Sequence, residues 1–225
     1  MKKGRNAALI AASSLALIAA VPAHATIIGG AVTTGTGSFF KLVVPFAAST
    51  PANTVGNDTF QNANLYGFDE DQNVAVSGTA LNVDYLAATG AAGSLPVGTV
   101  VASHYVFFDP RNVTTQKGYV DFDSPILAIV SETGPLAASD YLANTGVTYL
   151  SPSERGLEAG DFATVDSVLG YRLRVNWTAS TPGDYVRVLT AYSPAAVPEP
   201  ETWAMMLAGV GALATAARRR RSKAP

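Results

Sequence analysis

Residues 171–178, Tyr-Arg-Leu-Arg-Val-Asn-Trp-Thr, alternate between apolar and polar side chains. In an extended chain this alternation places the apolar members on one face, which is the pattern of a half-buried β-strand. The residues predicted to point inward are Tyr171, Leu173, Val175 and Trp177. Residues 181–184, Thr-Pro-Gly-Asp, are typical of a turn, and the apolar run 185–192 follows directly. The whole segment therefore predicts a β-hairpin.

Shorter strand signals recur upstream of this segment without the periodicity of long helices. The run 97–108 alternates along its length, with Val100, Ala102, His104, Val106 and Phe108 predicted on one face. Further strands are predicted at 38–46, 73–85 (broken near Gly78), 118–122 and 126–131, with a loop at 51–64 and a helical turn at 136–144. Short strands joined by turns predict an all-β fold, an antiparallel β-sandwich of jelly-roll-like type, over residues 26–196.

The predicted domain is acidic. Residues 26–197 contain seven basic and fifteen acidic side chains, a net charge of −8, whereas the whole chain carries −2. An acidic domain does not neutralise backbone phosphates, so nucleic acid is excluded as a partner. The chain has no cysteine, which excludes disulfides, thiolate metal sites and a cysteine nucleophile. The charge is compatible with solubility or with oxygen-ligated cations such as Ca²⁺.

Residues 1–25 have the three parts of a secretory signal peptide. Three of residues 2–5 are basic, residues 7–21 are an apolar core, and Ala23 and Ala25 frame a small-x-small cleavage site. Cleavage after Ala25 would leave Thr26 as the first mature residue. No twin-arginine pair is present, so we expect export by the Sec machinery and cleavage by signal peptidase. The alternative, an uncleaved anchor, is disfavoured because the core is short for a membrane span.

Residues 197–225 form three consecutive blocks at the other end. Pro198 and Pro200 fix φ and lack backbone donors, which predicts an extended segment. Residues 202–217 carry no charge and would span about 24 Å as a helix, which makes a short transmembrane segment. The chain continues with the four arginines Arg218, Arg219, Arg220 and Arg221. They predict a membrane stop that keeps the C-terminus cytoplasmic and the domain outside.

The heptapeptide 198–204, Pro-Glu-Pro-Glu-Thr-Trp-Ala, resembles the PEP-CTERM sorting signal in its Pro-Glu-Pro-x-x-Trp-Ala variant. The matching residues are Pro198, Glu199, Pro200, Trp203 and Ala204. The resemblance implies that an exosortase, a membrane-embedded cysteine protease-transpeptidase of Gram-negative bacteria that make exopolysaccharide, recognises and cleaves the chain near this motif. A plain tail anchor is the alternative for the same apolar and basic blocks.

His104 is the only histidine outside the predicted signal peptide. A hydrolase triad needs such a histidine together with an exposed nucleophile, but the chain has no Gly-x-Ser-x-Gly elbow. Because His104 lies within an apolar strand, we expect a structural role for it. A single histidine also excludes a His-rich zinc site.

Asp69-x-Asp71-x-Asn73 resembles the opening of a calcium loop. Such a loop needs glycine at its sixth position and glutamate at its twelfth; here the sixth is valine and the twelfth is not glutamate. We therefore favour a solvated acidic loop and expect no cofactor, with Ca²⁺ as the minor hypothesis. Asp121 and Asp123 form a second pair of the same weak kind.

Two other groups of side chains bear on hydrolysis and sugar binding. The acidic group is Glu154, Glu158 and Asp161, and the aromatic group is Tyr171, Trp177 and Tyr185. Paired carboxylates serve glycoside hydrolysis, but without neighbouring aromatic subsites a surface loop is the favoured interpretation. Exposed aromatic rings would stack on sugars, whereas the alternation of 171–178 places two of these rings in the core.

These features predict an exported, non-enzymatic protein of the cell surface or the exopolysaccharide matrix. The expected partners are an exosortase, the Sec machinery, signal peptidase and, transiently, the inner membrane of a Gram-negative bacterium; extracellular polysaccharide is a further candidate. The alternatives are a carbohydrate-binding module, a hydrolase and a simple C-terminally anchored membrane protein.

Overall fold

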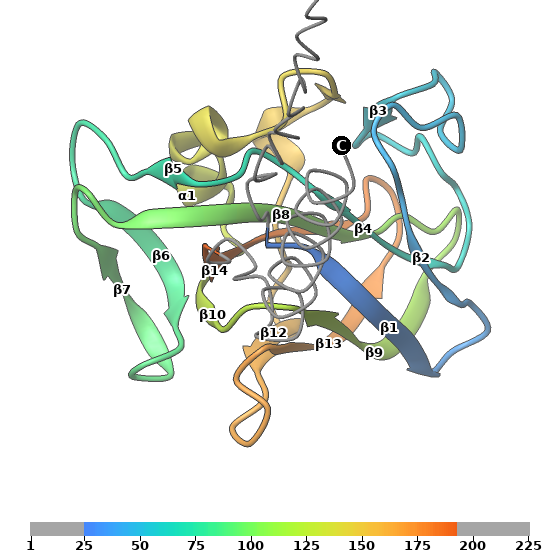
Figure 1. Cartoon of the computed structure of the whole chain (residues 1–225). Coiled ribbons are helices and arrows are strands. Elements are labelled where there is room, and N and C mark those ends of the chain that lie inside the picture. The colour runs from blue at the N-terminus through green and yellow to red at the C-terminus, as the bar shows by residue number, and fades with distance from the viewer. Residues whose placement is uncertain (1–24, 193–225) are drawn as a thin grey trace, which may run out of the picture.

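The computed structural model describes residues 25–192, which form two β-sheets packed face to face (Figure 1). The smaller sheet has four antiparallel strands in the order β1-β9-β13-β12. Its strands are β1 (Ile27–Thr34), β9 (Thr114–Phe122), β13 (Arg172–Ala179) and β12 (Phe162–Val165). The sandwich class predicted from the strand pattern is confirmed, while jelly-roll connectivity stays a prediction.

The larger sheet has eight strands, seven of them in the order β2-β4-β8-β14-β10-β6-β7, with β5 paired to β8 off this path. The strands are β2 (Phe39–Lys41), β4 (Leu65–Asp69), β5 (Val74–Ala75), β6 (Leu81–Leu86), β7 (Ala91–Leu95), β8 (Val100–Phe108), β10 (Ile126–Val130) and β14 (Asp184–Ala191). β2 and β4 are parallel, and the other pairs are antiparallel. β8 and β14 therefore occupy the middle of the sheet.

One hydrophobic core lies between the two sheets. Leu173, Val175 and Trp177 of β13 point into it and are buried, as the alternation predicted. Val186 and Val188 of β14 meet them from the larger sheet. This burial of alternate side chains is the main apolar contribution that holds the sheets together.

A second core covers the other face of the larger sheet. The covering layer contains α1 (Thr133–Ala138), the 3₁₀ turns η1 (Asp140–Leu142) and η2 (Pro152–Glu154), and the parallel pair β3 (Thr54–Val55) and β11 (Thr148–Tyr149). Tyr105, Phe107 and Leu189 pack into this layer, while their neighbours along β8 and β14 face the other core. Val106 and Phe108, predicted on one face of 97–108, do share the face toward the inter-sheet core, but the alternation did not indicate that the opposite face of β8 is covered as well.

The predicted hairpin of 171–178 and 185–192 is wrong. β13 pairs with β9 and β12, whereas β14 pairs with β8 and β10 in the other sheet. The turn at 181–183 carries the chain across the sandwich, so the apolar residues of the two strands meet through the core and not along a shared edge. Tyr171 lies outside β13 and is 40% exposed.

Several element boundaries differ from those predicted. The strand expected at 38–46 is limited to 39–41, since Pro45 lacks a backbone donor. The break near Gly78, whose φ is +75°, separates β5 from β6 as predicted. Six strands were not predicted: β1, β3, β4, β7, β11 and β12, of which β3 lies in the loop expected at 51–64. The sequences of β1, β7 and β12 are glycine- and alanine-rich or short and alternate weakly. The helical turn at 136–144 is divided between α1 and η1.

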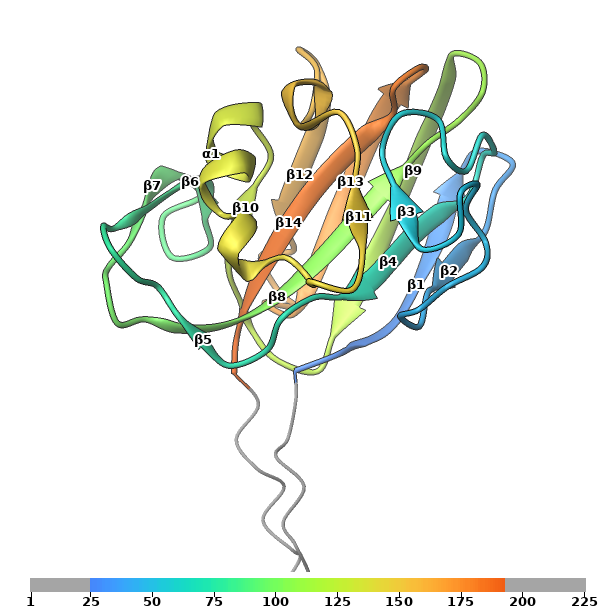
Figure 2. The same cartoon turned by 90° about the horizontal axis from the view of Figure 1, so that it is seen from above.

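Both ends of the described chain meet the turn between β9 and β10 (Figure 2). At the N-terminal end Asp123 donates its backbone N–H to the Thr26 carbonyl at 3.0 Å, and at the other end Ala191 donates to the Pro125 carbonyl at 2.8 Å. All members of both cores lie between Ile27 and Leu189, so we expect residues 26–197 to fold without the two terminal segments.

The predicted cleavage residue Ala23, the sorting motif, the transmembrane segment 202–217 and the arginines at 218–221 lie outside the described residues. Within residues 25–192, no helix is long and apolar enough to cross a membrane. The domain limits proposed from the sequence stay predictions.

Candidate functional site

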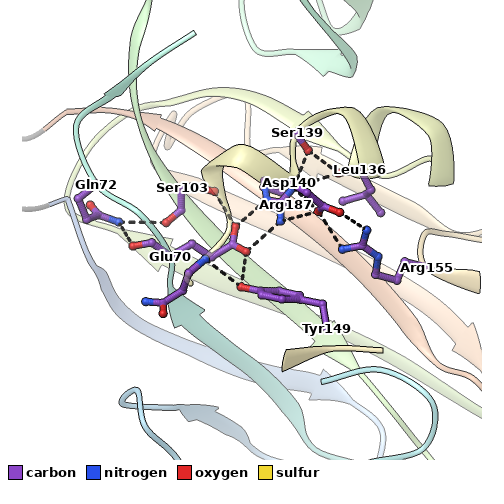
Figure 3. Close-up of polar contacts among 10 residues, drawn as sticks. Glu70, Gln72, Ser103, Leu136, Ser139, Asp140, Tyr149, Arg155 and Arg187 are labelled. Atoms are coloured by element: carbon purple, nitrogen blue, oxygen red, sulfur yellow. Dashed lines mark hydrogen bonds and ion pairs between the residues drawn. The ribbon is translucent and has the colours of Figure 1, made fainter. Parts of the chain in front are cut away.

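A buried ion pair joins the larger sheet to its covering layer (Figure 3). Arg187 stands on β14, opposite Tyr105 of β8, and its side chain is fully buried. Glu70, directly after β4, is buried as well and accepts from the Arg187 Nε at 2.7 Å and from its Nη2 at 3.0 Å. This bidentate geometry is the arrangement in which a guanidinium and a carboxylate interact most strongly.

Hydrogen bonds saturate the rest of the Glu70 carboxylate. Ser103 donates its hydroxyl to Oε2 and Tyr149 donates its hydroxyl to Oε1, both at 2.6 Å. The Arg187 Nη1 donates to the Leu136 carbonyl at 3.1 Å and to the Ser139 hydroxyl at 2.6 Å. The network therefore connects β4, β8 and β14 to α1 and β11.

Asp140 of η1 extends the network to a second arginine. Its Oδ1 lies 3.3 Å from the Arg187 Nη1, and its two oxygens accept from Arg155 at 3.0 and 2.7 Å. Arg155 is almost fully buried, whereas the Asp140 side chain is 42% exposed. The covering layer thus supplies one carboxylate that reaches solvent between two buried guanidinium groups.

The network fixes the charge state of its members. Burial lowers the pKa of Arg187, but the Glu70 carboxylate more than compensates, so the pKa is raised and the guanidinium stays charged. Burial, reinforced by the charge of Glu70, raises the pKa of the Tyr149 phenol, which therefore stays a donor. Because Glu70 and Arg187 are both fully buried and paired with each other, this part of the network holds the layers together.

A second polar cluster lies at the edge of the sandwich, where β1 begins. Asp69 of β4 accepts from the Thr26 hydroxyl at 2.7 Å and from the Ile27 N–H at 3.0 Å. The Lys41 Nζ lies 2.8 Å from Asp69 and also contacts the Thr26 hydroxyl. Burial would raise the pKa of Asp69, but the hydrogen bond and electrostatic effect of His104 and the hydrogen bonds from Lys41 and Thr26 outweigh it, and the pKa is lowered below its usual range.

His104 completes this cluster from β8. Its Nδ1 lies 2.8 Å from the Asp69 Oδ1 and its Nε2 lies 3.0 Å from the Thr190 Oγ1. Hydroxyl, imidazole and carboxylate follow one another as in a hydrolase triad, but such a triad needs a nucleophile that a substrate can reach. Thr190 and His104 are both fully buried, and the imidazole packs against Phe122 at 4.7 Å between ring centres.

The residues proposed for calcium take part in different local structures. The Asp69 carboxylate is bound to Lys41, while Asp71 donates its backbone N–H to the Leu142 carbonyl at 3.3 Å. Asn73 adopts a left-handed conformation, with φ at +57°, in the turn before β5. Among residues 25–192, no three or more His, Cys, Asp or Glu side chains gather in a way that could hold a metal ion.

The second pair proposed for calcium is also divided between two partners. Asp121 pairs with Arg172, at 2.6 Å between Oδ1 and Nε. Asp123 accepts from the Thr26 backbone N–H at 2.8 Å. The two carboxylates therefore have different partners: Asp121 pairs with an arginine on the outer face of the smaller sheet, and Asp123 accepts a hydrogen bond at the start of β1.

The acidic group Glu154, Glu158 and Asp161 lies in the segment that leads to β12. The first two side chains are exposed, and Asp161 accepts from the Thr178 N–H at 2.8 Å. A further carboxylate, which the sequence analysis did not include in this acidic group, is the buried Asp184; its Oδ2 has no hydrogen-bond partner among the described residues. Burial, together with repulsion from Asp161 and Glu158, raises the pKa of Asp184 to about 8.

The aromatic residues considered for sugar binding do not form a platform. Trp177 is fully buried and Tyr185 is 1% exposed; only Tyr171 reaches solvent. A pocket of about 290 Å³ lies between α1 and the start of β6, with Asn82 and Tyr141 in its wall and no histidine or carboxylate. Neither feature resembles the site of a sugar-cleaving enzyme.

Sequence reasoning missed the Glu70–Arg187 pair. One signal was available: Arg187 is the only charged residue between Asp184 and Tyr192, in a run that is otherwise rich in apolar side chains. An arginine at such a position is seldom buried unless a carboxylate pairs with it. Nothing local indicated which carboxylate that would be.

Residues 196–221 match a family model described as the PEP-CTERM protein-sorting motif, which confirms the resemblance predicted from the sequence. The matched range contains the Pro-Glu-Pro-x-x-Trp-Ala residues and Arg218–Arg221. This signal implies export toward the cell surface and processing by an exosortase. Comparison with curated proteins and with solved structures found no match.

Proposed function

We propose that this chain, which carries a PEP-CTERM sorting motif, is a non-enzymatic β-sandwich protein of the cell surface or exopolysaccharide matrix of a Gram-negative bacterium. It is exported by the Sec machinery, freed from its signal peptide by signal peptidase, and held briefly at the inner membrane. An exosortase then cleaves it near Pro198–Pro200. The mature domain has a structural role at the surface, without catalysis, and it needs no cofactor.

The observation that carries this proposal is the relation between the domain and the motif. The described domain ends at Tyr192, and the matched motif begins at residue 196. Five residues lie between Tyr192 and Pro198, so the six Cα–Cα steps that join them span at most about 20 Å. The last strand that the structure describes, β14, ends at Ala191, so cleavage near the motif would release the described sheets without breaking any of their strands.

The interior of the domain supports a role without catalysis. His104, on which a hydrolase would depend, is buried between the sheets and bonded to Asp69 and Thr190. Trp177 and Tyr185, on which a sugar-binding surface was considered, pack in the two cores. These placements favour a structural protein over a hydrolase or a carbohydrate-binding module.

The experiment compares cell and medium fractions by immunoblot in a host that carries an exosortase. We expect the wild type to be shortened and to leave the membrane. The double variant Pro198→Ala with Glu199→Ala should stay longer and membrane-retained, because the recognition element is lost. The matched control is Glu201→Ala, at a variable position of the motif, which should behave as the wild type.

A plain tail anchor gives a different result. The wild type would then stay full-length in the membrane, and the double variant would have the same size and location. That outcome would refute the sorting proposal. Replacement of Arg218–Arg221 by serine tests the membrane stop separately, because each arginine at a helix centre opposes insertion by about 2.5–3.5 kcal/mol.

A further inference from the structure

The residue predicted to become the mature N-terminus is already built into the fold. Thr26 donates its backbone N–H to the Asp123 Oδ1 at 2.8 Å, and Asp123 donates its own N–H to the Thr26 carbonyl at 3.0 Å. The Thr26 hydroxyl donates to Asp69 at 2.7 Å. Main chain and side chain of this one residue are therefore held by two carboxylates from different strand ends.

Within the described part of the uncleaved chain, no ion pair neutralises the Asp123 carboxylate, whose contact is the Thr26 backbone N–H. Asp69 and Asp123 are two anions, and Lys41 is the cation that contacts this cluster. The remaining titratable neighbour, His104, contacts Asp69 and Thr190 through its two ring nitrogens. Lys41 is bound to Asp69 and to the Ile27 carbonyl, so within residues 25–192 Asp123 lacks a charged partner.

Cleavage of the signal peptide would supply that missing charge. Hydrolysis of the Ala25–Thr26 bond consumes one water, leaves a carboxylate on Ala25 and creates an amine on Thr26. An α-amine has an ordinary pKa of about 7.7–8.0 and is mostly protonated at neutral pH. Its nitrogen is the atom that already lies 2.8 Å from the Asp123 carboxylate.

We propose that the α-ammonium group of Thr26 created by signal-peptide cleavage forms an ion pair with Asp123 and thereby fastens the first residue of the mature domain to the β9–β10 turn. The proposal rests on the export step of the proposed function and on cleavage after Ala25. Cleavage then does more than release the leader: it replaces the neutral amide donor to the Asp123 carboxylate by a charged ammonium, so the hydrogen bond becomes an ion pair and β1 begins at a fixed point.

The position of this anchor gives it a consequence for the whole domain. β1 is an edge strand of the smaller sheet and pairs with β9 alone within that sheet, so its start depends on few hydrogen bonds. The same turn accepts the Ala191 N–H through Pro125, where the chain leaves the domain toward the sorting motif. The ammonium would therefore secure the end of the sandwich from which both terminal segments leave.

The test uses two purified chains with defined N-termini, residues 26–197 and residues 25–197, each released from a fusion partner without extra residues. In the second chain Thr26 keeps an amide nitrogen, and the ammonium is displaced by one residue. Each chain is made as wild type, with Asp123→Asn, and with the exposed-residue control Glu154→Gln. Asparagine still accepts a hydrogen bond, so Asp123→Asn removes the charge alone.

The readout is the hydrogen-exchange rate of the Ile27 amide, which reports opening at the start of β1. An exposed ion pair of ordinary strength predicts that Asp123→Asn accelerates exchange about two- to fivefold in the chain that begins at Thr26. The acceleration should be under about 1.5-fold in the chain that begins at Ala25, and Glu154→Gln should change neither. In 1 M salt the difference between the chains should largely disappear.

Equal acceleration in both chains, or an acceleration that salt does not reduce, would overturn the ion pair. N-terminal sequencing of the exported protein tests the export step by itself. A mature start other than Thr26 would refute the biological premise of the proposal, and the exchange measurement on the purified chains would separately decide whether the ammonium binds Asp123.

Discussion

Removal of the Glu70 carboxylate should strongly destabilise the domain. In Glu70→Ala, the Arg187 guanidinium loses its bidentate partner at 2.7 and 3.0 Å, and the hydroxyls of Ser103 and Tyr149 lose their acceptor. Breaking one side of a buried ion pair costs about 3–5 kcal/mol, because the remaining charge is left without compensation. Asp140 still reaches Arg187 at 3.3 Å but is partly exposed, so it replaces only a fraction of the interaction.

The assay is urea unfolding of residues 26–197, followed by fluorescence. Trp177 is the only tryptophan in this range and is fully buried, so its emission reports the loss of the inter-sheet core. For a domain of this size, a loss of 3–5 kcal/mol lowers the melting temperature by roughly 10 °C. We expect both measurements to show this loss for Glu70→Ala, and a smaller one for Glu70→Gln, which keeps an acceptor.

Two comparison variants test the reasoning behind this magnitude. Asp121→Asn removes one side of the partly exposed Asp121–Arg172 pair and should cost about 1 kcal/mol or less. The double variant Glu70→Leu with Arg187→Met removes both buried charges and should lose less stability than Glu70→Ala alone. A free energy of unfolding for Glu70→Ala within 1 kcal/mol of wild type, or a double variant less stable than the single one, would refute the argument.

Three further predictions concern acidity, metal and catalysis. The pKa of Asp184 is raised to about 8 from an ordinary value near 3.9, so the folded state holds a proton that the unfolded state has lost. The stability that this proton contributes is complete below pH 4 and is lost as the pH rises through 8. Between these two pH values the free energy of unfolding should therefore fall by at most about 1.4 kcal/mol per pH unit. The variant Asp184→Asn should flatten this slope. Calorimetry at 25 °C should find weak or no Ca²⁺ binding, because Asp69 is bound to Lys41 and His104; a tight site that disappears in Asp71→Ala would contradict this. Residues 26–197 should hydrolyse none of a panel of polysaccharides and esters, and turnover that His104→Ala abolishes would show that the buried histidine is catalytic after all.

The sequence by itself determined the features that depend on local order. The period-two pattern at Leu173, Val175 and Trp177 is a property of neighbouring residues, and it predicted both the strand and its buried face. The sorting motif is likewise a short contiguous string, and its match at residues 196–221 needs no tertiary structure. Weakly patterned strands were not predicted for the same reason: the glycines at 29 and 30 of β1 provide no side chains that could alternate.

Only the tertiary structure decided which elements meet. Alternation predicts that a strand has a buried face but not which strand lies beside it. The hairpin predicted from residues 171–192 therefore proved to be two strands in opposite sheets. The burial of β8 and β14 on both faces depends on a covering layer contributed by segments far away in the chain. Glu70 and Arg187 lie 117 residues apart and leave no local trace of their pairing. A buried charge requires a partner because its desolvation must be compensated, but the folded chain alone determines where that partner lies.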